Sequence, residues 1–416
     1  MNKSKKKFTM HSHSKFVMKK LIIFTKLFPY GKTEAFLESE VGVISKYFDE
    51  IIFCPTYKST YIREIPDNAK INSTFIINYW IFIYAALLSI VNGNFFLSLF
   101  DHRKKIKSLK SIITLYKYSI FDVYYKLSFK KQKLELNNSV IYSYWFNPRV
   151  NSIIKLKEKN KLNCKIITRA HRWDIYETET LQFPYREYSI KKIVKIYSIS
   201  SDGKKYLDEK YNTNNKVIVS RLGVFDKGHI NLPSEDNHLH IVSVSQVTER
   251  KRVLLILESL IELAKTTTKL KIKWTHFGIG NLFDKLNNQV NTLRISNLEI
   301  DLKGYVRNTE IYDFYKKEKI DLFINVSESE GIPVSIMEAQ SFGIPVIATD
   351  VGGTTEIVND DIGKLLSSVP DIEEINNAIK LVTNKRINRN DIKESWNKLS
   401  NAEKNFTEFA NSLLSL

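Results

Sequence analysis

Several residue types and patterns are scarce in this 416-residue chain, and each scarcity excludes a class of protein. Only two cysteines occur, Cys54 and Cys164, which are too few for a zinc site or a disulfide framework. The first 16 residues are rich in Lys, Ser and His and lack the apolar core of a secretion signal. The sequence also contains no helix-turn-helix, zinc-finger or RNA-recognition pattern.

The chain carries an excess of positive charge, with 63 Lys and Arg residues against 45 Asp and Glu residues. The net charge of +18 favours an anionic partner, either a nucleic acid or a membrane surface. Because no nucleic-acid-binding pattern accompanies the charge, we expect no nucleic-acid partner and favour an anionic membrane surface.

An apolar run at 75–91, followed by a second at 95–100, bears on whether the protein contacts a membrane. The first run is shorter than the ~18–20 residues of a usual membrane span and contains Asn78. A span would also separate two predicted strands of one sheet by a bilayer. Two alternatives remain: a helical pair buried in the domain, or an interfacial helix, which the aromatic residues and the basic run at 102–107 favour.

Buried-type strands alternate with helical stretches in two blocks. The expected strands lie at 20–25, 51–54, 140–143, 164–169, 195–199 and 217–220, and then at 241–245, 271–277, 298–303, 320–326 and 344–349. This alternation predicts an α/β protein with parallel sheets covered on both faces. The expected parts are a disordered basic tail at 1–17, a first Rossmann-like domain at 18–225, a linker at 226–237, a second Rossmann-like domain at 238–390, and a C-terminal helix at 391–416 that could return to the first domain.

The most informative segment lies at residues 330–338. Pro333 suits the first position of a helix, whose free N–H groups form a site for a phosphate or diphosphate. Glu330 precedes this helix end, and Glu338 lies five residues past Pro333, about 7.5 Å along the axis. One ligand could place a diphosphate on the helix end and a hydroxylated ring against each carboxylate. A nucleotide-sugar has that shape.

The run at 329–357 (SEGIPVSIMEAQSFGIPVIATDVGGTTEI) closely resembles the donor-site signature of retaining glycosyltransferases of family 4. The resemblance implies the GT-B fold, in which two Rossmann-like, doubly wound domains face each other across a cleft. It further implies that a nucleotide-sugar contacts Glu330, Gly331, Ile332, Pro333, Val334 and Glu338.

The loop after the strand at 241–245 resembles the basic donor loop of this family. The family usually has Gly-Arg and then Lys-Gly in this loop, whereas this chain has Ser245-Gln246 and Lys251-Arg252. The resemblance makes Lys251 a phosphate ligand and catalytic cation, with Arg252 a weaker candidate; the alternative is a solvated basic turn. The amide of Gln246 can form a hydrogen bond but cannot neutralise charge. Further along, Gly280 and Asn281 match the turn beneath the diphosphate, and Val306 and Arg307 match the nucleobase contacts.

The first domain resembles the acceptor domain of the same family. Residues 28–40 (FPYGKTEAFLESE) are similar to the opening of a branch that builds exopolysaccharide, capsule and lipopolysaccharide, with Gly31 allowing close backbone approach. Glu38 and Glu40 are expected to be ordinary helix residues. Arg169, His171 and Asp174 match the family's R-x-H-x-x-D pattern. His171 is then expected to bind the transferred sugar, and Arg169 and Asp174 to orient His171 or touch the acceptor.

The combined prediction is a retaining, cytoplasmic glycosyltransferase, peripheral on the inner face of the cell membrane. It would move a sugar from a nucleotide-diphosphate sugar to a lipid-linked saccharide in bacterial surface polysaccharide synthesis. No cofactor or metal is expected, because the chain has no Asp-x-Asp pair at a strand end and the cationic loop can meet the diphosphate charge. The cleft motif at 169–174 contains no carboxylate pair of the retaining-hydrolase kind, and the resemblance implies front-face transfer instead, in which the leaving diphosphate helps deprotonate the acceptor hydroxyl. Two alternatives stay open: a non-catalytic partner or chaperone of another transferase, and a sugar-nucleotide epimerase on the same fold.

Overall fold

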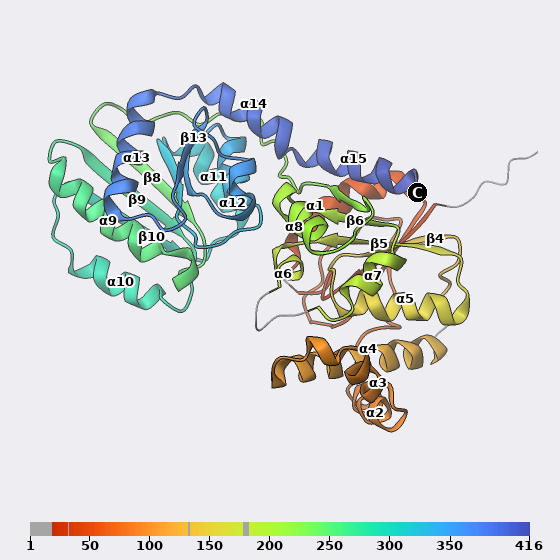
Figure 1. The fold of residues 1–416 in the computed structure, drawn as a ribbon. Helices are drawn as coiled ribbons and strands as arrows, with labels where there is room; N and C mark the ends of the chain where they lie inside the picture. Colours follow the sequence, from red (N-terminus) through yellow and green to blue (C-terminus); the bar gives the residue numbers. More distant parts are fainter. Residues whose placement is uncertain (1–18, 32, 132–133, 178–182) are drawn as a thin grey trace, which may run out of the picture.

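The computed structural model describes residues 19–31, 33–131, 134–177 and 183–416. The predicted tail at 1–17 lies outside these residues. Two α/β domains lie side by side (Figure 1). The first contains β1 (Lys20–Thr25), α1 (Ala35–Ile44), β2 (Glu50–Pro55), β3 (Ala69–Ile71), α2 (Tyr79–Val91), α3 (Asn94–Asp101), α4 (Leu109–Lys131), β4 (Ser139–Ser143), α5 (Pro148–Asn160), β5 (Cys164–Ala170), α6 (Arg172–Ile175), α7 (Arg186–Lys192), β6 (Lys195–Ser198), α8 (Ser201–Lys210) and β7 (Val217–Val219).

The second domain follows a segment at 226–237 that has neither helix nor strand. It contains β8 (His238–Val244), the 3₁₀ turn η3 (Glu249–Lys251), α9 (Val253–Thr266), β9 (Lys271–Phe277), α10 (Phe283–Thr292), β10 (Leu298–Gly304), α11 (Asn308–Lys317), β11 (Leu322–Asn325), α12 (Val334–Ser341), β12 (Val346–Thr349), η4 (Gly352–Glu356), β13 (Gly363–Leu366) and α13 (Ile372–Lys385).

Each domain is built on a parallel sheet. The strand orders are β3-β2-β1-β4-β5-β6-β7 and β10-β9-β8-β11-β12-β13. Along β1, Leu21 and Ile23 enter one apolar core while Ile22 and Phe24 enter another, so both faces of the sheet are covered. The prediction of two Rossmann-like, doubly wound domains is confirmed. In such sheets, ligands bind beyond the carboxyl ends of the strands where the strand order reverses. Those points are β1/β4 in the first domain and β8/β11 in the second.

The C-terminal segment joins the two domains. Where one helix was expected over 391–416, the chain forms α14 (Arg389–Leu399) and α15 (Ala402–Leu414). The break occurs at Asn401, whose side chain accepts a hydrogen bond from the Lys404 N–H (3.2 Å) and so caps a new helix. Both helices run along one edge of the molecule (Figure 1). Phe406 and Phe409 of α15 lie in the core of the first domain.

The apolar run forms α2 and α3, which lie on the opposite side of the first domain from α15 (Figure 1). One side of α2 packs on α4, while the other is exposed. Within the described residues, no single helix is both long and apolar enough to cross a bilayer. Taken together, α2 and α3 reach the required length and apolarity, but they meet at a 61° bend.

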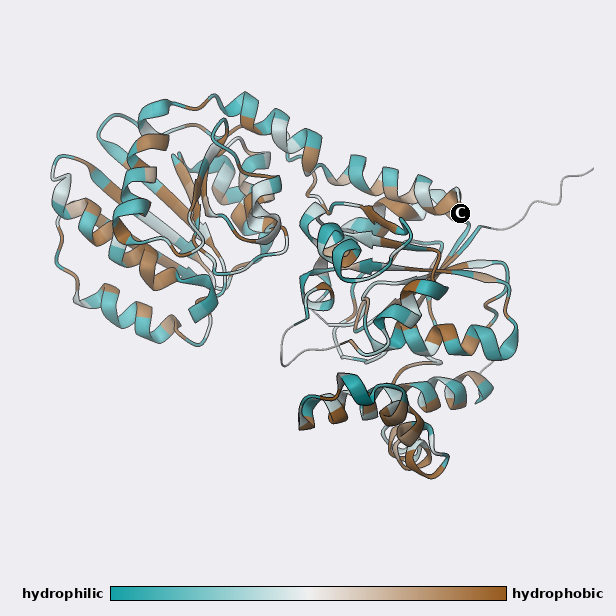
Figure 2. Ribbon diagram, viewed as in Figure 1, coloured by the Kyte–Doolittle hydropathy of each residue, from teal (hydrophilic) through white to brown (hydrophobic). Residues whose placement is uncertain are grey.

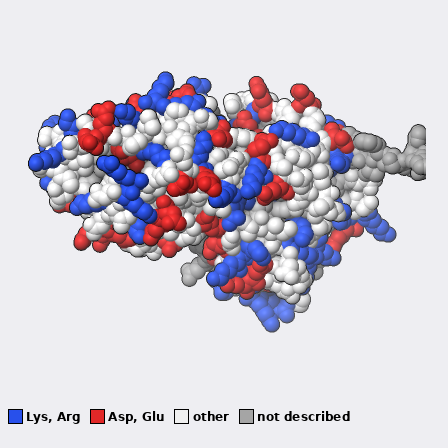
Figure 3. All heavy atoms as spheres, turned by 90° about the horizontal axis from the view of Figure 1, so that it is seen from above, with Lys and Arg blue, Asp and Glu red and all other residues white. Residues whose placement is uncertain are grey.

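The charge excess does not collect in one stripe on the face that carries α14 and α15. Figure 3 shows Lys and Arg mixed with Asp and Glu over both domains on that face. This distribution offers no continuous basic track there for a nucleic-acid backbone.

Candidate functional site

The loops after β8 and β11 meet at the point where the strand order of the second sheet reverses. Lys251 at the end of η3 forms an ion pair with Glu330, and Asn325 lies 3.5 Å from the same carboxylate oxygen. The Glu328 N–H donates to the Arg250 carbonyl (2.8 Å), so the two loops are also joined through their backbones. Both charged side chains are largely buried, with 15% and 12% exposed. The predicted phosphate ligand and the predicted sugar-binding carboxylate are therefore in direct contact.

The Gly352-Gly353 turn explains part of the sequence signature. A Cβ at Gly352 would lie 2.1 Å from the Glu330 carbonyl oxygen, and φ is +54° there. The Gly353 N–H donates to the Gly331 carbonyl at 2.7 Å. A side chain on this turn would displace the loop that carries Glu330. Past this loop, α12 begins at Val334 with Pro333 as its N-cap, one position later than predicted.

Glu338 lies inside the domain rather than on a solvated helix face. Only 5% of it is exposed, and its carboxylate accepts hydrogen bonds from Asn308 (2.9 Å) and Tyr312 (2.8 Å). Burial raises the pKa of Glu338 to about 7, against the opposing effects of the Tyr312 hydrogen bond, Lys227 and the Asn308 hydrogen bond. Sequence reasoning missed Asn308 and Tyr312. Their spacing of four on one helix face after Val306 and Arg307 is the signal that could have found them.

The other predicted donor residues lie around this centre. Gln246 is exposed just after β8, and Gly280 packs so closely on this loop that a Cβ would lie 2.3 Å from the Val247 carbonyl oxygen. Asn281 donates to Glu249 (3.1 Å). Val306 is partly buried, and Arg307 caps α11 and pairs with Glu310 (2.7 Å). Their predicted roles stay predictions.

Arg252 does not join Lys251 as expected. Its backbone is left-handed (φ +48°), and its guanidinium donates to the Ser368 carbonyl at 2.7 Å. This interaction holds the side chain on the loop after β13. A second cation on the diphosphate is therefore not supplied by Arg252 in this conformation.

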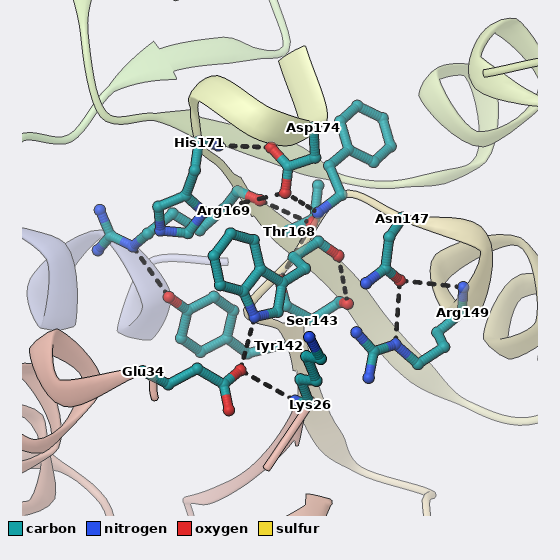
Figure 4. A network of polar contacts seen from close by, with 12 residues as sticks. Lys26, Glu34, Tyr142, Ser143, Asn147, Arg149, Thr168, Arg169, His171 and Asp174 are labelled. Carbon is teal, nitrogen blue, oxygen red and sulfur yellow. Dashed lines mark hydrogen bonds and ion pairs between the residues drawn. The ribbon is translucent and has the colours of Figure 1, made fainter. Parts of the chain in front are cut away.

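His171 occupies the end of β5 in the first domain, next to the β1/β4 reversal. Its backbone N–H donates to Asp174 Oδ1 (2.6 Å), and Asp174 Oδ2 accepts from the Phe146 N–H (2.8 Å) (Figure 4). The imidazole packs on Tyr144 and Trp145, with ring centroids 4.8 and 4.6 Å away. Only 7% of His171 is exposed, yet neither ring nitrogen has a hydrogen-bond partner among the described residues. Nδ1 lies 3.9 Å from Asp174 Oδ2, so Nε2 is the ring nitrogen with neither a hydrogen-bond nor an ion-pair partner among the described residues.

Glu34, which sequence reasoning missed, organises this part of the site. Its carboxylate accepts hydrogen bonds from the backbone N–H groups of Lys26 (2.9 Å; Figure 4), Leu27 (2.7 Å) and Phe28 (2.8 Å). It also accepts one from the Trp145 indole N–H (2.5 Å). Glu34 therefore ties the loop after β1 to the indole that packs on His171. In that loop, Gly31 (φ +70°) donates its N–H to the Tyr61 carbonyl at 2.9 Å. The signal was present in the sequence, since Glu34 lies within the quoted 28–40 pattern.

Arg169 and Glu40 correct two expectations. Arg169 is fully buried and pairs with Glu40 (2.9 Å), donates to the Tyr142 hydroxyl (2.9 Å) and lies over the Phe409 ring of α15 (4.4 Å). Because successive strand residues point to opposite faces, its side chain faces α1 and α15. Arg169 cannot touch an acceptor there, so only a supporting role remains. Glu40 is likewise not an ordinary helix residue, since it is fully buried and its burial raises its pKa.

The two half-sites meet across the domain junction. Arg172, next to His171, donates from Nε to the Ser329 hydroxyl at 2.8 Å, and Gly331 packs against the Arg172 side chain. Burial and the nearby Arg250 lower the pKa of Arg172. A second contact joins Arg221 and Glu356 at 2.6 Å. Within the described part of the chain, no group of three or more His, Cys, Asp and Glu could hold a metal ion.

Comparison with known proteins identifies what this arrangement resembles. Residues 225–398 match the family model described as "Glycosyl transferases group 1". A putative colanic acid biosynthesis glycosyltransferase, WcaL of Escherichia coli K12, is 26% identical over 226 residues, 52% of this chain and 54% of that protein. The matched part thus spans about half the length of that relative.

Two solved structures share the whole architecture. The lipopolysaccharide outer core galactosyltransferase WaaB, in its apo form, aligns with a TM-score of 0.65 at 16% identity, covering 95% of this chain and 99% of that one. Anabaena HepE in complex with UDP aligns with a TM-score of 0.62 at 12% identity, covering 96% and 100%. The chain therefore has the GT-B fold, and its second domain matches the glycosyltransferase group 1 family.

Proposed function

We propose that the chain is a retaining, metal-independent glycosyltransferase of family 4. It moves a sugar from a nucleotide-diphosphate sugar to a lipid-linked saccharide at an anionic membrane surface, in bacterial surface polysaccharide synthesis. One observation carries the proposal. The Lys251–Glu330 pair lies beside the N-terminus of α12, where the strand order of the second sheet reverses, and the adjoining domain contributes His171, whose Nε2 has no partner among the described residues.

The donor end follows from this geometry. A diphosphate placed between the first turn of α12 and Lys251 would receive partial positive charge from the helix and a full charge from the ammonium group. Fixed positive charge stabilises a leaving diphosphate as its negative charge develops. Lys251 would then share its charge between the phosphate and Glu330, leaving carboxylate oxygens to accept bonds from sugar hydroxyls. Glu338, farther along α12, suits the ribose hydroxyls.

The first domain contributes the buried imidazole of His171. The Asp174 carboxylate holds the His171 backbone, and Tyr144 and Trp145 hold the ring, so little motion is needed before sugar binding. A sugar hydroxyl bonding Nε2 of His171 would satisfy a polar atom that is otherwise buried without a partner. The role of His171 is thus to hold the transferred sugar between the two domains.

Three observations support, in turn, the nucleotide-sugar donor, the polysaccharide product and the lipid-linked acceptor. HepE, with the same fold, was solved with UDP, which fits a nucleotide-diphosphate donor. WcaL is named for colanic acid biosynthesis, which fits a polysaccharide product. The exposed apolar side of α2 and α3 gives a route by which the protein could meet a lipid-linked substrate.

The deciding experiment is a screen of nucleotide sugars by thermal shift, since a ligand that binds only the folded protein raises its melting temperature. Hits are then incubated with a lipid-linked saccharide in excess EDTA, and proton NMR reads the anomeric configuration of the new bond. We expect the donor's configuration to be kept. An inverted product, or an absolute requirement for Mn²⁺ or Mg²⁺, would contradict the proposal.

The same assay separates the two alternatives. An epimerase would convert the donor without any acceptor. A non-catalytic partner would neither hydrolyse the donor nor transfer its sugar. Gln246, which replaces the cation of the family's usual loop, is the residue that motivates this second alternative.

A further inference from the structure

The Lys251–Glu330 pair brings no net charge to the donor end of the site. Both side chains are largely buried, and each neutralises the other. Gln246, in the loop after β8, is neutral, and Arg252 is held on the Ser368 carbonyl. A leaving diphosphate gains negative charge as its bond to the sugar breaks, and a fixed cation stabilises that charge. A second cation for the diphosphate would therefore come from another segment of the chain.

Arg172 of the first domain lies against the loop that carries Glu330. It is the first residue of α6 and directly follows His171. Its Nε donates to the Ser329 hydroxyl at 2.8 Å, and its Nη2 donates to the same oxygen. A Cβ on Gly331 would lie 3.3 Å from the Arg172 Cβ. Because Ser329 and Gly331 flank Glu330, the Arg172 guanidinium lies beside the loop that is expected to hold the sugar.

The edge of the first domain that faces the second domain is polar. Figure 1 shows α6 and α8 on this edge, and Figure 2 shows mostly hydrophilic residues on α8 and at the start of α6. Arg172 Nη1 has no hydrogen-bond partner within the part of the chain that the structure describes. Because the donors of a guanidinium form a planar fork, Nη1 can bind a phosphate oxygen while Nε and Nη2 stay on Ser329.

An arginine of the second domain lies close to Arg172. The guanidinium carbons of Arg172 and Arg250 lie 4.9 and 5.2 Å from the centroid of the Trp173 ring, and Trp173 is 60% exposed. Burial lowers the pKa of Arg172, and the nearby Arg250 charge lowers it further. The Glu330 and Glu328 carboxylates oppose this lowering, but neither forms an ion pair with either arginine among the described residues. Two guanidinium groups that repel each other, and that no carboxylate pairs with, favour the binding of an anion.

We infer that Arg172 is a catalytic residue, which the first domain supplies to the diphosphate of the donor. Its Nη1 binds the phosphate next to the sugar, while Lys251 holds the same diphosphate from the second domain. The inference rests on the proposed function and adds to that site a cation from the other domain.

The transfer step leaves negative charge on the diphosphate. The bond between the anomeric carbon and the phosphate oxygen breaks, and its electron pair stays on that oxygen. The acceptor hydroxyl oxygen forms a bond to the same carbon, and its proton passes to the diphosphate. Arg172 and Lys251 stabilise the charge that the phosphate oxygen gains. Because Arg172 belongs to the first domain, this stabilisation exists only while the two domains are in contact.

Donor hydrolysis in the absence of acceptor tests the inference, with the full chain and a nucleotide-sugar identified by thermal shift. Arg172→Gln removes the charge but keeps a side-chain N–H that can bond Ser329. It should slow hydrolysis roughly 10- to 150-fold, as expected for the loss of a hydrogen bond to a charged group. Ser329→Ala keeps the charge and removes the bond, and it should slow hydrolysis by less than about fivefold. Arg294→Gln, at an exposed position after α10, is the matched control and should hydrolyse the donor at the wild-type rate.

Equal losses in Arg172→Gln and Ser329→Ala would assign Arg172 to the contact between the domains alone and overturn the inference. Nucleotide binding gives a second measurement that does not depend on turnover. Calorimetry compares UDP with UMP, or GDP with GMP, according to the donor found. Arg172→Gln should weaken binding of the diphosphate roughly tenfold or more and leave that of the monophosphate unchanged, because only the diphosphate carries the phosphate that Arg172 contacts. An equal change for both nucleotides, or no change for either, would overturn the inference.

A lipid-linked acceptor could offer a diphosphate of the same chemistry. If Arg172 bound that diphosphate instead, Arg172→Gln would hydrolyse the donor and bind UDP or GDP as the wild type does, and only KM for the acceptor would rise. This result would overturn the assignment to the donor. Failure of the proposed function looks different, since the wild type would then neither bind a nucleotide diphosphate nor release one from a sugar donor.

Discussion

The buried carboxylate of Glu338 makes a prediction that needs no knowledge of the donor. Replacing it by Gln keeps its size and leaves a carbonyl oxygen to accept the bonds from Asn308 and Tyr312. The substitution removes only the ability to ionise. Its effect on stability should therefore depend on pH.

The sign follows from the raised pKa. The folded protein holds the proton up to about pH 7, whereas the ordinary pKa of a glutamate, which applies to the unfolded chain, is 4.5. Below pH 4.5 both states are protonated, so the full stability is present; it falls as pH rises towards 7 and is lost above it. A difference of about 2.5 pH units corresponds to roughly 3 kcal/mol at 1.36 kcal/mol per unit. Glu338→Gln escapes this loss and should be more stable than the wild type at pH 8.

Urea denaturation at pH 4.5 and pH 8 measures the effect. We expect the free energies of unfolding of variant and wild type to agree within about 1 kcal/mol at pH 4.5 and to differ by roughly 3 kcal/mol at pH 8. Glu310→Gln, on the exposed side of α11, is the matched control and should show no such pH dependence. A variant that is equally stable or less stable than the wild type at pH 8 would refute the reasoning.

The same substitution should impair nucleotide binding. A hydrogen bond to a charged acceptor contributes about 1.5–3 kcal/mol, so loss of the carboxylate from the ribose hydroxyls should weaken UDP or GDP binding roughly 10- to 150-fold. Calorimetry with the bare diphosphate measures this directly. Higher stability together with weaker binding would identify Glu338 as a residue kept for function at the expense of stability.

Three further predictions concern other parts of the site. Arg169→Met should destabilise the first domain by about 3–5 kcal/mol in urea denaturation, because it leaves the buried Glu40 carboxylate without its cation, although the Tyr142 hydroxyl still donates to it; Glu40→Leu in addition should restore part of the loss, and a change below 1 kcal/mol would contradict this. Lys251→Met should lower kcat for transfer roughly 100- to 1,000-fold, as expected for loss of a fixed cation at a leaving group, and a change confined to KM would contradict that role. Donor hydrolysis should proceed at an unchanged rate in excess EDTA, and complete loss restored by Mn²⁺ would show that the donor site was misread.

Local sequence patterns identified most of the architecture. The predicted bounds of β1 and β9 match those found. In β1 the signal is a continuous apolar run, which is typical of strands buried on both faces. Gly343 follows α12 with φ +71°, the left-handed conformation in which a glycine commonly ends a helix. These features depend on neighbours within a few residues, so the sequence contains nearly all the information that determines them.

The parts that failed depend on distant residues. Arg169 lies in a pattern that resembles a binding motif, yet it pairs with Glu40, 129 positions earlier, and packs on α15 at the other end of the chain. Glu34 was passed over because its partner Trp145 is 111 positions away. Arg252 was a weaker candidate for binding the diphosphate beside Lys251, but its backbone is left-handed and its side chain bonds the loop after β13. Only the fold brings these pairs together.

The most direct test of the central claim compares Glu330→Gln with the wild type, using a donor identified by thermal shift. Glu330 should contact the sugar and pair with Lys251 but should not hold the ribose. The account predicts that release of nucleotide diphosphate falls at least 100-fold in Glu330→Gln, while its affinity for the bare nucleotide diphosphate stays within threefold of the wild type. Unchanged release, or a loss of nucleotide affinity as large as that of Glu338→Gln, would contradict a nucleotide-sugar site built on the Lys251–Glu330 pair.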